Sequence, residues 1–306
     1  MKTMLKVLAI TLAAILLLGI KGAKAGEEYK KVVKKEFAIN PDAQVNISNK
    51  FGKVHFTNWE KNEVSIEVTI TVDASSEKAA EKRFSRIGID IAGNSTLVTA
   101  TTTIDDGISG NKGSFSIDYM VNIPVTVNLD VTNKFGDIFI NELTGKSRID
   151  LGYGNLEVRK LDHADNLLEV KFGKARINSM KGAVLTLKYS EMKLDYAGSL
   201  RLNSKFSDLN AQRIIALNMV LEGGKLDMQK SSAIESRSKF SDIDVERIDK
   251  SLNLDIQYGQ CRVGDMAADF TDINIRNKYG DVMINMAESA RYNLDAEMKF
   301  CELDYP

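Results

Sequence analysis

The sequence predicts an all-β protein: a single-stranded parallel β-helix, or solenoid, of about nine short coils behind an N-terminal β-rich cap that contains one short helix. Three observations support this fold class. The pattern of residues 133–140, NKFGDIFI, recurs about ten times along the chain. Apolar and polar residues alternate within each copy, as in a half-buried strand. The copies are also too short to hold a helical crossover, so each strand is expected to pair with its equivalent one unit along.

The first 25 residues have the layout of a secretory signal peptide. Lys2 and Lys6 precede an apolar run from Leu8 to Ile20, and Ala23-Lys24-Ala25 offers a cleavage site between small residues. The apolar run is shorter than the roughly 20 residues of a spanning helix, so no transmembrane segment is expected after signal cleavage. The net charge is −1, or −5 without the four lysines of residues 1–25. This charge argues against nucleic acid as a partner.

Residues 26–132 are predicted to form the cap and the first coils. The stretch from Asn62 to Val72 alternates like a strand, and an early copy of the repeat, NKFGKVHF, begins at Asn49. Residues 73–86 break this rhythm: Ser75 or Ser76 can cap a helix whose Ala80 and Phe84 share one face. A loop rich in Gly, Asp and Asn follows at residues 105–113. We expect the region with the helix to cover the N-terminal end of the stack, because terminal coils otherwise expose unpaired edges.

Residues 133–306 are predicted to form the β-helix itself. One position of the repeat is aromatic, at spacings of 17 to 21 residues, with Gly223 in the one empty place. A small residue follows each aromatic and marks a corner where the backbone turns tightly. The apolar positions fall three and five residues after the aromatic, as in Ile138 and Ile140, and point inward. An antiparallel sandwich is the nearest rival, but its strands need not repeat their side chains.

These features together carry a resemblance. The export signal, the FGKVHF strand followed by WEKNEVSIEVTITV, the short helix, the IPVTVNLDV segment and the run of GDI, GNL and SDI strands resemble the bacterial adhesin-like β-strand-repeat family. Its members are labelled autotransporter adhesin heads of the GIN type. The resemblance implies an exported right-handed β-helix of unknown function without an established catalytic residue set. It also implies a role in adhesion or envelope stress.

A column of lysines directly before the aromatic position is the main candidate binding surface. Stacked at strand spacing, the lysines would form a basic stripe beside an aromatic one, suited to anionic glycans or lipid head groups. The other interpretation, which stem burial in general favours, is that the lysines are solvated and their aliphatic stems cover the rings. The residues of this stripe are Lys134, Lys171, Lys188, Lys205, Lys239, Lys278 and Lys299 with Phe172, Tyr189, Phe206 and Phe240.

Acidic residues two positions after the aromatic raise the question of catalysis. Paired carboxylates can hydrolyse glycosides, but this column mixes signs, with Lys174, Glu191, Asp208, Lys225 and Asp242 in order. Mixed signs favour a structural ladder of cross-strand pairs. His55 and His163 have no nucleophile nearby in the sequence, and Cys261 and Cys301 occupy different positions of the repeat, so neither a triad nor a disulfide is expected. We predict no catalytic, metal or cofactor-binding residue and no cofactor.

The sequence therefore predicts an exported structural or adhesin-like binding protein of a bacterial cell envelope, without catalytic activity. Its place would be the periplasm, the outer-membrane surface or the extracellular space. The expected partners are envelope or host glycans or an envelope protein. Two alternatives stay open: a carbohydrate-active β-helix enzyme, either a polysaccharide lyase or a hydrolase, and an envelope-stress protein that recognises another protein.

Overall fold

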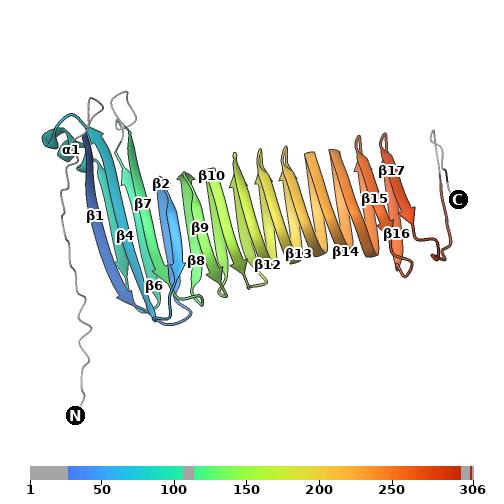
Figure 1. Cartoon of the computed structure of the whole chain (residues 1–306), viewed down its shortest axis with the longest axis horizontal. Helices are drawn as coiled ribbons and strands as arrows, with labels where there is room; N and C mark the ends of the chain where they lie inside the picture. The colour runs from blue at the N-terminus through green and yellow to red at the C-terminus, as the bar shows by residue number, and fades with distance from the viewer. Residues whose placement is uncertain (1–26, 106–113, 298–303, 305–306) are drawn as a thin grey trace, which may run out of the picture.

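The computed structural model describes residues 27–105, 114–297 and 304. The predicted signal peptide and most of the predicted loop at residues 105–113 lie outside this part of the chain. Figure 1 shows one long stack of strands, with longer strands and the helix at the N-terminal end and short, regular coils running to the C-terminal end. No helix in the described ranges is long and apolar enough to cross a membrane.

The regular part is a parallel β-solenoid of about nine coils between residues 129 and 286. Each strand pairs with its equivalent one coil along: Ile149 pairs with Leu168, and Leu185 pairs with Leu202. This confirms the solenoid predicted from the repeat. Its strands are β8 (Asn128–Phe135), β9 (Ile138–Leu143), β10 (Ser147–Leu161), β11 (Asn166–Lys171), β12 (Gly173–Lys188), β13 (Glu191–Lys205), β14 (Asp208–Gln257), β15 (Gln260–Met266), β16 (Asp272–Lys278) and β17 (Asp281–Met286).

The inward positions of these strands form one continuous apolar core. Ile138 and Ile140, predicted to point inward, are 1% and 0% exposed. Equivalent residues from successive coils stack on one another, so each coil buries its apolar face against its neighbours rather than within itself. Full burial of one such side chain contributes about 1.5 to 3 kcal/mol, which lets the stack hold together through packing alone.

The N-terminal cap is a mixed sheet with one helix. Its strands are β1 (Glu27–Ala38), β2 (Gln44–Phe51), β3 (Val54–Asn58), β4 (Glu63–Ala74), β5 (Ile87–Gly93), β6 (Leu97–Ile104) and β7 (Phe115–Ile123). β4 lies antiparallel between β1 and β7, and β5 lies antiparallel beside β6. The helix α1 (Glu77–Phe84) joins β4 to β5, and the Ser76 side chain accepts a hydrogen bond from the Ala79 amide at 3.3 Å. Ala80 and Phe84 are buried, so the predicted helix and its buried face are confirmed.

The order of the first coils in the stack differs from their order in the chain. β2 and β3 pair in parallel with β8 and β9 on one side and with β6 and β7 on the other. The early repeat copy is therefore the coil directly before residues 128–143, and residues 97–123 lie outside it. Figure 1 shows this as the blue β2 beside green strands. The chain leaves the stack after β3, builds β4, α1 and β5, and returns.

Candidate functional site

The aromatic position of the repeat forms a ladder of stacked rings along one corner of the solenoid. From Tyr153 to Tyr258 the rings are about half exposed, with Phe172 at 48% and Phe240 at 58%, whereas Phe51 and Phe135 are less exposed and Tyr279 is more exposed. Neighbouring ring centroids lie 4.9–5.4 Å apart, close to the spacing of the strands that hold them. The ladder runs without a break through Phe51, Phe135, Tyr153, Phe172, Tyr189 and Phe206, and resumes with Phe240, Tyr258 and Tyr279.

The backbone turns this corner in two different ways. In the first coils the residue after the aromatic takes the left-handed conformation, as at Gly136 (φ 127°) and Gly154 (φ 140°). From Phe172 onward the aromatic residue itself takes it, with φ between 47° and 56°, except at the corner without an aromatic residue, where Gly223 (φ 72°) and Gly224 (φ 93°) both take it. A non-glycine residue pays about 1–2 kcal/mol for this conformation. The small residue thus marks the corner as predicted, but it carries the unusual dihedral angle only in the early coils.

Serine hydroxyls close three of the later corners. In each, the serine after the aromatic donates a hydrogen bond to the carbonyl of the lysine before it, at 2.8 Å for Ser190 and Ser207 and 3.0 Å for Ser241. Short hydroxyl side chains make such local turns readily. These bonds help to hold the aromatic residues in their strained conformation, with the rings facing solvent.

The predicted lysine column is divided into paired and unpaired members. Lys171 lies 3.1 Å from Glu169, Lys188 lies 3.0 Å from the same carboxylate, and Lys205 lies 3.0 Å from Glu222. Lys134, Lys239 and Lys278 have no carboxylate within ion-pair distance among the described residues. Lys134 and Lys239 lie over the rings that follow them, 5.7 and 5.3 Å from the centroids, and the paired Lys205 does so too, at 5.6 Å. Lys299 lies outside the described residues.

The acidic column has a structural role in the described coils. Asp137 and Asp208 each accept a hydrogen bond from a backbone amide one coil along, both at 2.9 Å. Glu191 pairs with Lys174 at 2.9 Å, and the amino group of Lys174 lowers the pKa of Glu191. Lys174 and Glu191 form a cross-strand ion pair of the kind that the mixed signs of this column favoured, whereas Lys225 pairs with Asp227 of its own strand.

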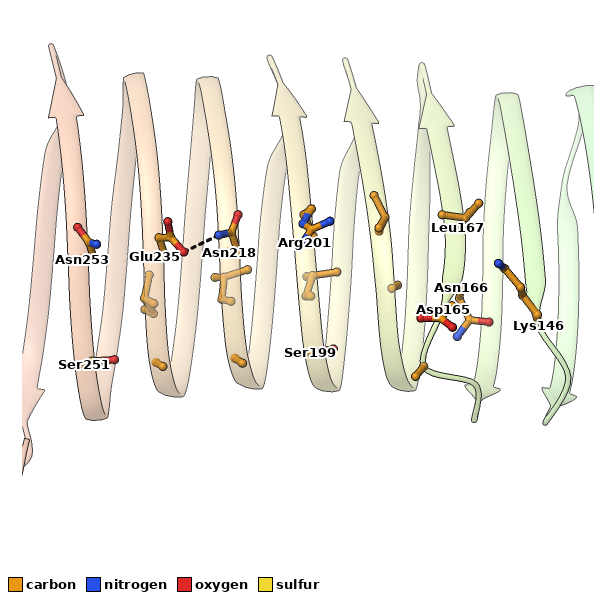
Figure 2. Close-up of a pocket in the computed structure, with 18 of the residues that line it drawn as sticks. Lys146, Asp165, Asn166, Leu167, Ser199, Arg201, Asn218, Glu235, Ser251 and Asn253 are labelled. Atoms are coloured by element: carbon orange, nitrogen blue, oxygen red, sulfur yellow. Dashed lines mark hydrogen bonds between the residues drawn. The ribbon is translucent and has the colours of Figure 1, made fainter. Parts of the chain in front are cut away.

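A shallow groove of about 800 Å³ runs along the outer surface at the opposite end of the same strands. Figure 2 shows Arg201, Asn218, Glu235 and Asn253 in one row across successive coils, with Lys146 toward one end. Asn218 donates a hydrogen bond to Glu235 at 2.6 Å. Arg201 and Lys146 have no ion pair within the described ranges. The groove therefore presents donors and acceptors in turn, one coil apart.

Small residues create this groove. Ser199, Ala216, Ala233 and Ser251 have short side chains and line it two residues before the polar row. Asp272 is the register partner of Ser251 and lines the groove at the last coil. Sequence reasoning missed this site because it concentrated on the aromatic position. Aligning every position of the repeat would have shown a column that is small in consecutive copies.

The remaining candidates of the sequence have packing or local roles. Cys261 is a free thiol in the core, and burial raises its pKa to about 12. The His55 ring contacts that of Phe139 at 4.3 Å, and His163 Nδ1 accepts a hydrogen bond from the Asp165 amide. Within the described ranges, no three His, Cys, Asp or Glu side chains form a group that could hold a metal ion. Cys301 lies outside these ranges.

No family model matches the chain, and no curated protein matches it. Among solved structures, it is similar to a "putative adhesin" from Bacteroides fragilis, with 11% identity, a TM-score of 0.33 and coverage of 83% of this chain and 97% of that one. A "putative lipid binding protein" from Parabacteroides distasonis has 13% identity, a TM-score of 0.33 and coverages of 84% and 97%. A "putative adhesin" from Parabacteroides merdae has 14% identity, a TM-score of 0.31 and the same coverages. The expected likeness to adhesin-like proteins is thus confirmed as a distant structural similarity.

Proposed function

We propose that the protein is an exported, non-catalytic component of a bacterial cell envelope that binds an extended neutral glycan in its surface groove. The observation that carries this proposal is the row Arg201, Asn218, Glu235 and Asn253, which lines a groove that runs along the stack. A polymer lying along the stack would meet one polar side chain about every 4.8 Å. Sugar hydroxyls both donate and accept hydrogen bonds, so they can satisfy each member of this mixed row.

The charge of the groove favours a neutral polymer. Its lining contains two basic residues, Lys146 and Arg201, and three acidic ones, Asp165, Glu235 and Asp272. A strongly anionic polymer would meet repulsion at each carboxylate, whereas a neutral glycan pays no such penalty. Concave sites with a few well-placed polar groups are the usual form of a ligand site.

The spacing of the groove carboxylates supports binding without hydrolysis. Asp165 and Glu235 lie four coils apart, which corresponds to about 19 Å, and Glu235 and Asp272 lie two coils apart and two residues out of register, which corresponds to about 12 Å at the usual strand spacing and rise. Glycoside hydrolases place their two carboxyl groups about 5 to 10 Å apart. A carbohydrate-active enzyme stays the alternative function, and release of reducing ends from the glycan during the binding experiment would favour it.

The test is a glycan array of neutral and acidic polysaccharides followed by titration calorimetry on each hit. Ala216→Trp fills the groove floor and should weaken neutral-glycan binding at least tenfold. Asn210→Trp is the matched control, because Asn210 is an exposed strand position in the coil before Ala216 and does not line the groove. Equal affinity for both variants and the parent would remove the groove from the proposal. Binding to an envelope protein and to no glycan would favour the protein-recognition alternative.

A further inference from the structure

The aromatic ladder has one missing rung. Glycine replaces the aromatic residue at position 223, between Phe206 and Phe240. These two rings belong to coils two steps apart, which places them about 10 Å from each other at the usual strand spacing. A ring midway between them would lie about 5 Å from each neighbour by the same spacing, which matches the 4.9–5.4 Å between stacked rings elsewhere in the ladder. The coil spacing therefore leaves room for one aromatic ring when Phe206 lies parallel to Tyr189, whereas in this structure the Phe206 ring leans into that space.

The two rings beside the gap differ from the rest of the ladder. Phe206 is tilted 25° from Tyr189 and leans over Gly223, where a Cβ atom would lie 2.7 Å from its Cδ1. Phe240 stacks on Tyr258 on one side and has no ring partner on the side of the gap. Rings inside an unbroken run present only their edges to a ligand. The gap is the place between two rings of the described ladder where a ring face can receive a ligand once Phe206 returns to parallel stacking.

The charged side chains around the gap comprise one ion pair and one lysine without a carboxylate partner among the described residues. Glu222 precedes Gly223 and is paired with Lys205 at 3.0 Å, so this acid and base offset each other. Lys239 lies 5.3 Å from the centroid of Phe240 and has no carboxylate within ion-pair distance in the described part of the chain. The gap therefore combines an open aromatic face with an available cation.

We propose that the gap at Gly223 binds one aromatic ring that carries a carboxylate. The ring of the ligand completes the ladder between Phe206 and Phe240, and its carboxylate pairs with Lys239. Stacking favours an aromatic ring here because offset stacked pairs are attractive beyond the area they bury. This site lies at the opposite end of the strands from the groove, so it does not depend on the proposed glycan binding.

Phenylacetate is the probe, with uncharged phenylacetamide and non-aromatic glucuronate as comparisons, measured by ligand-detected NMR titration on the full protein. Phenylacetate should bind saturably and at least tenfold more tightly than the other two. Gly223→Phe fills the gap and should reduce phenylacetate binding at least tenfold. The neighbouring aromatic corners, with φ of 47° to 56°, show that an aromatic residue can adopt the left-handed backbone found at Gly223.

Two further variants keep the test decisive if Gly223→Phe does not fold. Phe240→Leu removes the open ring face and should also reduce binding at least tenfold. Lys239→Gln should lower phenylacetate binding to the level of phenylacetamide. Lys134→Gln is its matched control, because Lys134 also lies unpaired over a ring but inside the unbroken ladder. Absence of saturable binding, full binding to folded Gly223→Phe, equal loss in both lysine variants, or tighter binding of glucuronate would each overturn the proposal.

Discussion

Two coils of the solenoid share the same outer pattern and have different interiors. In the coil of residues 199–214, Leu202 is 0% exposed and the Ser204 hydroxyl donates to the Ser207 carbonyl. In the coil of residues 233–248, the two equivalent positions are Ser236 and Ser238, both buried and both without a hydrogen-bond partner for the hydroxyl. Their lysine, aromatic and serine corners are nevertheless alike.

The difference indicates that coils with the same corner can have different interiors. Each coil contacts only its two neighbours, so stability is approximately a sum of coil and interface terms. One weak coil can therefore persist between apolar neighbours. The weak coil also lies next to Gly223, so the missing rung and the polar interior occur together.

The largest expected effect comes from giving the first coil the interior of the second. Leu202→Ser leaves a cavity and a buried hydroxyl, and we expect a loss of about 3 to 5 kcal/mol in the free energy of unfolding. Chemical denaturation would measure it. A loss below about 1 kcal/mol would mean that both coils pack equally loosely, so that their different interiors contribute similarly to the free energy of unfolding.

The features shared by all coils could be predicted from the sequence. Strand pairing, the inward positions of Ile138 and Ile140 and the solvent-exposed ladder follow from a period that repeats the same side chains. The capping of α1 by Ser76 follows from local chemistry. Each of these depends on residues close in sequence or on the repeat itself.

The remaining features depend on contacts that the repeat does not encode. The position of residues 97–123 outside the early copy depends on antiparallel partners, β1, β4 and β5, that have no repeat pattern. The sequence could not show which residue of a corner takes the left-handed conformation. It is the small residue Gly136 in one corner and the aromatic Phe172 in another, although a small residue follows the aromatic in both. The groove depends on small residues whose significance appears only when successive coils are placed side by side.

A smaller effect should separate the serines of the two coils. Ser236→Ala removes a buried hydroxyl without a partner and should stabilise the fold by about 1 kcal/mol. Ser204→Ala removes a hydroxyl that donates to Ser207 and should destabilise it by about 0.5 kcal/mol. Thermal unfolding of both variants beside the parent would measure the contrast. Opposite signs are expected, and an equal change in both would contradict the difference in hydrogen bonding.

The smallest effect concerns the loss of stability at low pH, where the paired lysines of the column differ from Lys239, which is unpaired within the described ranges. Burial alone would raise the pKa of Glu169, but hydrogen bonds from Lys188 and Lys171 outweigh it and lower the pKa below 4.5. A carboxyl whose pKa is lower in the folded state than in the unfolded state stabilises the protein at any pH above its unfolded-state pKa. This contribution is lost as the pH falls through the folded-state pKa. Glu169→Gln should therefore reduce stability at pH 7 and flatten its decline below about pH 4.5. Lys239→Gln should leave that decline unchanged, because Lys239 has no such carboxylate partner among the described residues. Denaturation at several pH values would compare them, and parallel curves for Glu169→Gln and the parent would show that the ion pairs of the column contribute no pH-dependent stability.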